Sequence, residues 1–297
     1  MKLLTSLSTI ILLSVHLTSA QNPHFKTLGK LSKTLQSSSG IEVSKSNTIW
    51  TINDHGLPVV YGIDTTGQII KAIHLNHSVI DWEDLALDQK GNLFVGDFGN
   101  NHNKRKNLRI YRIDNIDSVT KNIVTAKIIR FRLSDQKEFP PPENKMSFDI
   151  EAMIAYQDSL YLFSKSREKP FKGNVKLYVL PANNYETEVE AKLIDSLSLG
   201  DGPMFENWIT GAALSRDQKK LILLSHGKFW LFTCFEGNNF FKGKVKEVNM
   251  QNFSQKEAVA FKDANTLIIT DELFQGLLGG NLYEYDISNI LTTLNCK

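Results

Sequence analysis

The sequence predicts an all-β protein, a β-propeller built as one domain from five four-stranded blades. Three observations support this prediction. An apolar hairpin pattern recurs five times along the 297 residues, each hairpin is followed by a third apolar strand, and no segment shows the 3.6-residue period of a long amphipathic helix. Repeated four-stranded sheets of this kind remove their exposed edges by closing into a ring, which favours a propeller over an open sheet.

The repeated unit is a hairpin of two apolar strands joined by a polar turn. In the second unit, Glu83 opens the first strand and Asp97 ends the second strand fourteen residues later. The same spacing holds in three other units, and the fourth unit has one extra turn residue. A register kept this closely indicates repeated β-hairpins. The first positions are Ser39, Glu83, Glu151, Thr210 and Glu257, and the last positions are Asn53, Asp97, Lys165, Ser225 and Asp271.

Outer strands complete the units. The third strands are "PVVYGID", "LRIYRID", "VKLYVLP", "FWLFTCF" and "NLYEYDI", and four units continue with "QIIKAIHL", "TAKIIRFRL", "EAKLIDSLSL" and "KVKEVNM". The last unit lacks a fourth strand, so we expect the N-terminal segment "HFKTLGKLSKTL" to close it. The units are unevenly spaced, with 68 residues between Glu83 and Glu151, so six blades stay open as an alternative. The tail "SNILTTLNC" has room for one short helical turn.

The first twenty residues are expected to lie outside the fold, which leaves residues 21–297 for the propeller. Lys2, the apolar run "IILLSVHL" and the small residues that end at Ala20 are typical of a signal peptide cleaved after Ala20. The run is too short to span a bilayer, so we expect a secreted or periplasmic monomer without stable membrane insertion, with an uncleaved anchor as the alternative. An exported chain can form disulfides, and the sequence leaves open whether Cys234 and Cys296 do so.

The charge of the chain gives no indication of a nucleic-acid partner. The net charge is +2, charged residues make up 22% of the sequence, and no cluster combines basic with aromatic residues.

Hairpin geometry predicts that both ends of the repeated motif gather at one mouth of the central channel. The start of the first strand lies beside the end of the second, and the first strand of each blade is innermost in a propeller. Asp54 follows the last position of the first unit and joins the same mouth. The expected acidic residues are Glu83, Glu151, Glu257, Asp54, Asp97 and Asp271, against one basic residue, Lys165.

Carboxylates this close together must bind a cation, take up protons or turn outward. Together with neutral oxygens they suit Ca²⁺, or Mg²⁺ that keeps some of its water, and do not suit Zn²⁺. The alternative is that they accept backbone N–H groups of the next blade and only hold the blades together. The predicted Ca²⁺ ligands are Glu83, Glu151, Glu257, Asp97, Asp271, Asp54, Asn53, Ser39 and Thr210.

Catalytic motifs are missing from the sequence, which has no G-x-S-x-G, H-E-x-x-H or Ser-His-Asp arrangement. Lys165 and His226 are weak catalytic candidates, and Lys165 fits better as an ion-pair partner of the acidic residues. Glu42 is left out, since the register places it inside its strand. Two basic stretches, Asn101–Asn107 and Lys165–Lys172, are expected in loops at the same mouth, where they would hold a small anionic ligand or remain solvated.

The first two units carry a resemblance to a known group of proteins. "SSGIEVSKSNTIWTINDHG" and "DWEDLALDQKGNLFVGDFGNN", with the later "FDIEAM" and "KEAVAF", resemble a group of exported β-propellers similar to the SdiA-regulated and phytase-like propellers. More distantly, the chain is similar to gluconolactonase and paraoxonase propellers. The resemblance implies a calcium-binding channel and no particular reaction. Ser39 and Thr210 replace acids at the first position, and no catalytic base is carried over.

Three functions follow from these observations. The first is an exported binding module that holds a divalent cation, with calcium the expected cofactor, and a small anionic ligand at the channel mouth. The second is a metal-dependent hydrolase of phosphoesters, lactones or esters, in which the metal polarises the substrate. The third is a scaffold that binds a protein partner, in which the acidic residues only tie the blades together.

Overall fold

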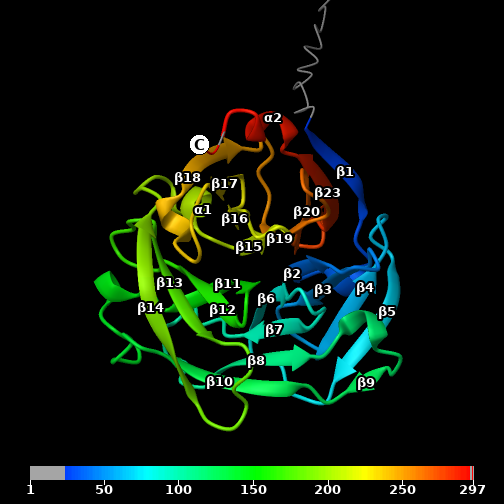
Figure 1. The fold of residues 1–297 in the computed structure, drawn as a ribbon, viewed down its shortest axis with the longest axis horizontal. Coiled ribbons are helices and arrows are strands. Elements are labelled where there is room, and N and C mark those ends of the chain that lie inside the picture. Colours follow the sequence, from blue (N-terminus) through cyan, green and yellow to red (C-terminus); the bar gives the residue numbers. More distant parts are fainter. Residues whose placement is uncertain (1–23, 295, 297) are drawn as a thin grey trace, which may run out of the picture.

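The computed structural model describes residues 24–294 and residue 296. The expected signal peptide, residues 1–20, lies outside these described residues. The chain is a β-propeller: four-stranded antiparallel sheets surround a central channel, and their innermost strands contact one another in a closed ring (Figure 1). Among the described residues, no helix is long and apolar enough to cross a bilayer.

The strand pairing gives five four-stranded units, which we number as blades 1 to 5. The innermost strands are β2 (Ser38–Val43), β6 (Trp82–Leu87), β11 (Asp149–Tyr156), β15 (Gly211–Leu214) and β19 (Lys256–Phe261). The second strands are β3 (Ile49–Asn53), β7 (Leu93–Asp97), β12 (Ser159–Lys165), β16 (Lys220–Leu224) and β20 (Thr266–Asp271). The third strands are β4 (Val59–Ile63), β8 (Leu108–Ile113), β13 (Asn174–Pro181), β17 (Lys228–Thr233) and β23 (Asn281–Asp286).

The outermost strands include the N-terminal one, as expected. They are β5 (Ile69–Leu75), β10 (Lys127–Leu133), β14 (Val189–Ser198), β18 (Lys244–Asn249) and β1 (Phe25–Lys30). The strand β1 pairs antiparallel with β23 of blade 5 and so closes the ring (Figure 1). Parallel pairing of β10 with β14 also joins the outer edges of blades 2 and 3.

Short elements lie between the strands of the blades and after the last strand. They are β9 (Ile123–Val124), which pairs parallel with β5, the hairpin of β21 (Leu273–Phe274) and β22 (Leu278–Gly279), α1 (Met204–Asn207), α2 (Ser288–Leu291) and four 3₁₀ turns at Lys33–Leu35, Ile116–Ser118, Glu143–Lys145 and Phe240–Lys242. The helix α2 is the short C-terminal turn that the sequence indicated. A disulfide joins Cys234, just after β17, to Cys296 in the C-terminal tail.

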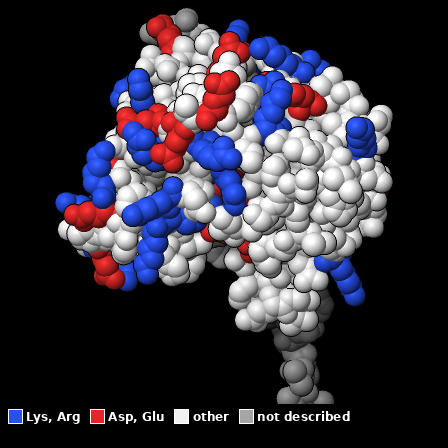
Figure 2. Space-filling model, turned by 90° about the horizontal axis from the view of Figure 1, so that it is seen from below, with Lys and Arg blue, Asp and Glu red and all other residues white. Residues whose placement is uncertain are grey.

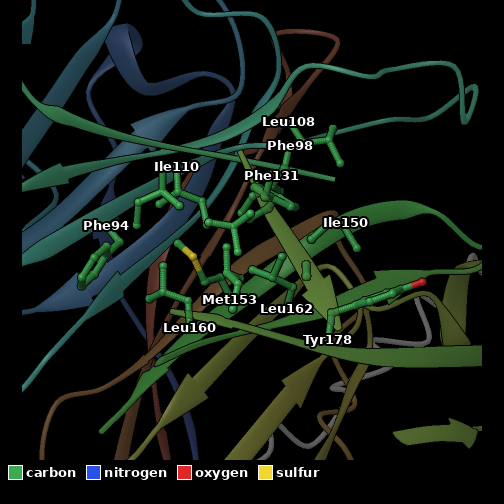
Figure 3. Packing of buried hydrophobic residues seen from close by; sticks show 14 of the residues in the cluster. Phe94, Phe98, Leu108, Ile110, Phe131, Ile150, Met153, Leu160, Leu162 and Tyr178 are labelled. Atoms are coloured by element: carbon green, nitrogen blue, oxygen red, sulfur yellow. The ribbon is translucent and has the colours of Figure 1, made fainter. Parts of the chain in front are cut away.

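The hydrophobic core lies between the blades. One cluster packs Phe94 and Ile110 of blade 2 against Met153 and Leu160 of blade 3 (Figure 3). Four further clusters each combine side chains of two neighbouring blades in the same way. Burial of one large apolar side chain stabilises a fold by about 1.5–3 kcal/mol, so contacts between blades supply much of the stability.

Charged side chains on the outer surface are mixed in sign. On the side of the molecule shown in Figure 2, Lys and Arg lie next to Asp and Glu. The mixed signs on this side agree with the small net charge of the chain, whereas acidic residues outnumber basic ones at the channel mouth.

Candidate functional site

An acidic cavity of about 120 Å³ opens at one mouth of the channel. It lies where the first strands begin and the second strands end, as hairpin geometry requires. Blades 1, 2, 3 and 5 supply its lining. The lining residues are Asp54, Asp81, Glu83, Glu151, Glu257 and Glu272, the two basic residues Lys165 and Arg167, and the polar residues Ser39 and Asn101.

β-Bulges place the three glutamates that were predicted for first positions. The register shifts at Glu83 in β6, at Glu151 in β11 and at Glu257 in β19. A bulged residue has no partner on the facing strand and its side chain is re-aimed, here toward the channel. The register differs from the expectation that Glu83 and Asp97 sit side by side, because the extra residue of the bulge brings Trp82 opposite Asp97 instead.

The same shift changes the partners of two other predicted pairs. Asp149 lies opposite Lys165, and Lys256 lies opposite Asp271. Glu151 nevertheless meets Lys165 through its side chain, with Oε1 3.1 Å from Nζ. Lys165 is therefore an ion-pair partner, as the sequence favoured.

Asp97 and Asp271 are fully buried and do not line the cavity. Asp97 accepts hydrogen bonds from Arg105 at 2.9 Å and from Arg109 at 3.1 Å. Asp271 accepts from the backbone N–H of Asn281 and from the hydroxyl of Tyr283, both at 2.7 Å. Each of these two carboxylates therefore ties its own blade to the adjoining loop or strand.

The predicted neutral ligands connect elements of the backbone. Asn53 donates to the carbonyl of Thr34 at 2.8 Å. The hydroxyl of Ser39 in blade 1 donates to the carbonyl of Glu83 in blade 2. The hydroxyl of Thr210 at the start of blade 4 donates to the carbonyl of Lys256 in blade 5 at 2.7 Å. Of these three residues only Ser39 also lines the acidic cavity.

Arg167 and Arg105 each pair with a buried carboxyl group and so offset part of the acidic charge. Arg167 donates to Asp149 at 2.7 Å and contacts Glu151 at 3.2 Å. Arg167 and Arg105 come from the two basic stretches noted in the sequence, and both hold buried carboxylates. The stretches therefore place part of their charge inside the protein, against acids, rather than in open arms around the mouth.

Burial raises the pKa of several carboxyl groups that line the cavity. The pKa of Glu83 is raised well above its usual value by burial and then by the neighbouring charge of Glu151. The pKa of Glu257 is raised in the same direction, again mainly by burial. Burial also raises the pKa of Glu272 to about 7 and that of Asp81 to about 6. A cation that entered the cavity would relieve this repulsion and displace protons.

A metal centre is not formed by the described residues. Within residues 24–294 and 296, no group of three or more His, Cys, Asp or Glu side chains is arranged to hold a metal ion. Glu151 is already paired with Lys165 and Arg167. The residues present therefore do not fit a preformed calcium site, although their oxygen chemistry is that of a calcium ligand set.

An aromatic groove of about 500 Å³ adjoins the acidic cavity and shares Lys165, Glu257 and Glu272 with it. Its walls come from the segment before β15, the loop between β18 and β19, and the β21–β22 hairpin. The apolar lining residues are Phe205, Trp208, Phe253, Phe274 and Leu278.

His226 lies in the wall of this groove and is 4% exposed. Its Nδ1 atom has no hydrogen-bond partner and lies 3.7 Å from Oε1 of Glu257. Burial, and then the charges of Lys165 and Lys256, lower the pKa of His226 to about 3, so the imidazole is neutral. His226 is therefore a buried side chain, although it follows the end of the second strand of its blade by only two residues.

Sequence reasoning missed Asp81, Arg167 and the apolar wall of the groove. Asp81 precedes the first strand of its unit by one residue, in the quoted "DWED" segment, and Arg167 lies in a basic stretch. The apolar residues stand in irregular loops, where no period marks them. Glu42, which the register excluded, is half-buried and accepts the backbone N–H of Leu87 at 3.1 Å, outside the acidic cavity.

Comparison with known proteins shows similarity in structure only. No family model and no curated protein sequence matches the chain. A PQQ-bound aldose sugar dehydrogenase from Streptomyces coelicolor has a TM-score of 0.47 at 13% identity over 88% of this chain and 97% of its own. A gluconolactonase from Xanthomonas campestris has a TM-score of 0.45 at 13% identity over 84% of this chain and 71% of its own.

A third solved structure, a protein of unknown function from Bacteroides thetaiotaomicron, has a TM-score of 0.49 at 9% identity and covers 88% of this chain and 75% of its own. Likeness at this level carries no argument about activity or about the number of blades. The propeller assignment rests on the strand topology, and the resemblance to SdiA-regulated and phytase-like propellers stays an interpretation of the quoted motifs.

Proposed function

We propose that the protein is a ligand-binding propeller that takes up a cationic group at the mouth of its channel. The observation that carries this proposal is the acidic cavity, in which six carboxyl groups face two basic side chains. Burial makes the ionised form of Glu83 and Glu257 unfavourable, so a cation gains more there than at the surface.

Calcium is the cation that the sequence favours, and it enters the proposal as the first metal to test. The ion pairs of Glu151 and the lack of a metal-binding group among the described residues argue against a preformed centre. We therefore assign no step to calcium. An ammonium or guanidinium group needs no such coordination geometry, because hydrogen bonds and one charge suffice.

Thermal unfolding in the presence of cations tests the proposal. At pH 8 and constant ionic strength, CaCl₂, MgCl₂, ethylammonium chloride and guanidinium chloride at low millimolar concentration are compared with NaCl. At least one cation is expected to raise the Tm of the wild type and to lose this effect in Glu83→Gln and Glu257→Gln. Equal Tm values in all five salts would overturn the proposal.

Hydrolysis of an ester, lactone or phosphoester is the second candidate function. The observation in its favour is the neutral imidazole of His226 beside the buried carboxyl of Glu257 in a groove that can hold a substrate. A neutral imidazole accepts a proton from water, and a carboxyl of raised pKa can return one. Turnover of aryl esters or lactones that is lost in His226→Asn would support it, and no turnover of any of the three classes would exclude it.

Export of the protein is part of the same proposal. The disulfide between Cys234 and Cys296 supports it, because disulfides persist in oxidising compartments. Mass spectrometry of the mature protein from its native host should find Gln21 at the N-terminus. A chain that begins at residue 1 or 2 would contradict the proposed cleavage.

A further inference from the structure

We propose that the aromatic groove binds a primary or secondary organic ammonium ion with an apolar body. The ammonium group lies against Glu257 and Glu272, and the apolar body lies between Phe205, Phe253, Phe274 and Leu278. This inference rests on the proposed uptake of a cationic group and specifies the ligand. It commits to a small molecule whose two parts match the two parts of the groove.

The apolar wall is the first argument. Phe205 is 55% exposed, Phe253 66%, Phe274 50% and Leu278 70%. These four side chains come from three separate segments and converge on one groove. An exposed apolar patch of this kind marks a binding site, because single exposed apolar residues are usually scattered. The groove volume of about 500 Å³ is that of an ordinary small-molecule site.

The carboxyl groups at the floor are the second argument. Glu257 and Glu272 line both the groove and the acidic cavity, so a charge placed between them faces the other carboxyl groups of that cavity. Lys165 also lines the groove, but its Nζ is held by Glu151 at 3.1 Å and lies 5.1 Å from the ring centre of Trp208. The lysine is thus committed to partners within the protein, and the two carboxyl groups remain for a ligand.

His226 is the third and independent argument. Its Nδ1 is buried without a hydrogen-bond partner, which destabilises a folded protein unless a ligand supplies a donor. The neutral imidazole with its proton on Nε2 presents Nδ1 as an acceptor, and Oε1 of Glu257 lies 3.7 Å away. An ammonium N–H is a donor that serves both acceptors. A quaternary ammonium has no N–H and would leave Nδ1 unpaired.

These arguments also separate the ligand from other candidates. A hydrated metal ion gains nothing from an apolar wall, and an anion is repelled by Glu257 and Glu272. An uncharged apolar molecule would leave the carboxyl groups and His226 as they are. Only a ligand with an N–H cation at one end and an apolar body at the other uses every part of the groove.

A set of matched probes tests the inference by calorimetry at pH 7.5. Phenethylammonium carries charge and ring, 2-phenylethanol carries the ring alone, and ethylammonium carries the charge alone. Phenylacetate reverses the charge, and phenethyltrimethylammonium keeps the charge without an N–H donor. Phenethylammonium is expected to bind at least tenfold more tightly than each of the other four.

Variants locate the binding. Glu272→Gln is expected to weaken phenethylammonium binding at least tenfold, and Glu257→Gln serves as a second variant in case one of the two fails to fold. Phe253→Ala should weaken phenethylammonium binding several-fold and leave ethylammonium binding unchanged. Ile123→Ala, at an exposed apolar residue in β9, and Glu138→Gln, outside the lining of the groove and of the acidic cavity, are the matched controls and should change neither.

The outcomes separate the two proposals. If Ca²⁺ or ethylammonium binds with the same dependence on Glu257 and phenethylammonium has no advantage, the cation proposal stands and the organic-ammonium inference is overturned. If 2-phenylethanol or phenylacetate binds as tightly as phenethylammonium, the inference is also overturned. If no cation of any kind binds, both proposals fail.

Discussion

Replacing Lys165 by Met should destabilise the protein strongly and in a pH-dependent manner. The Nζ of Lys165 lies 3.1 Å from Oε1 of Glu151, and their side chains are 8% and 4% exposed. At this distance and an effective dielectric constant of about 20, the attraction amounts to about 5 kcal/mol. Met keeps most of the apolar volume, so the change removes the charge and leaves little new cavity. Loss of one partner of a buried ion pair costs about 3–5 kcal/mol, and we expect that loss at pH 8.

The cost should shrink at pH 5. The pKa values of Glu83 and Glu257 are already raised by burial, and the loss of the ammonium charge raises them further. Because the raised pKa values favour the protonated form in the folded state, lowering the pH protonates these carboxyl groups there more readily than in the unfolded chain, and fewer negative charges lack their cation at pH 5 than at pH 8. The difference in unfolding free energy between wild type and Lys165→Met should therefore grow as the pH rises from 5 to 8.

Urea unfolding followed by tryptophan fluorescence measures both quantities. Lys169→Met is the control, because Lys169 pairs with Glu143 at 3.0 Å while both side chains are about 70% exposed, and such a pair contributes about 0–1 kcal/mol. A loss for Lys165→Met no larger than that of the control at pH 8, or an equal loss at pH 5 and pH 8, would refute the electrostatic account of the cavity.

Three further changes test other parts of the structure. Glu272→Gln should raise the free energy of unfolding by about 1–2 kcal/mol at pH 8 and leave it unchanged near pH 4.5. The reason is that the pKa of Glu272 is raised to about 7, so the native state of the wild type loses stability as the pH rises from 4.5 to 7. Identical urea profiles of variant and wild type at pH 8 would contradict this prediction. Gly40→Ala should cost about 2–4 kcal/mol, because a Cβ there would lie 2.5 Å from a backbone nitrogen of β6, whereas Gly56→Ala, with open space around it, should cost about 1 kcal/mol. Equal midpoints for these two variants would show that the close approach of blades 1 and 2 is unimportant. Cys234→Ser removes the disulfide to the C-terminal tail and should lower stability by about 2–4 kcal/mol in urea, a loss that reductant should reproduce in the wild type and not add to in the variant.

The propeller class could be predicted because apolar strands and polar turns recur in a fixed order. The inner strands and the closing role of β1 follow from that pattern. The five four-stranded units follow from the strand pairing. The predicted mouth of the channel also holds the predicted glutamates.

The residues that lie opposite each other on the first and second strands could not be predicted, because hairpins with the same spacing in the sequence have turns of different lengths. Blade 2 has a longer turn, in which Leu87 pairs with Leu93, and blade 3 has a tight turn, in which Tyr156 pairs with Ser159. A bulge near the mouth inserts one residue on the inner strand of blades 1, 2, 3 and 5, whereas the inner strand of blade 4 pairs without a shift. The constant count of fourteen residues therefore does not correspond to one constant register, and a register error of one residue turns a side chain to the other face.

Ser39 and Thr210, which replace acids at the first position of the motif, help to position the glutamates of the neighbouring blades. Ser39 donates its hydroxyl proton to the carbonyl of Glu83, the bulged residue of the next blade. Thr210 donates to the carbonyl of Lys256, which immediately precedes the bulge at Glu257. In both places a short hydroxyl side chain binds the backbone of a bulge that presents a glutamate to the channel. Two of the five first positions thus hold the bulges that carry Glu83 and Glu257, and three supply the carboxyl groups. The two roles predicted as alternatives, joining blades and attracting a cation, are divided among the residues at the first positions of the repeated sequence motif.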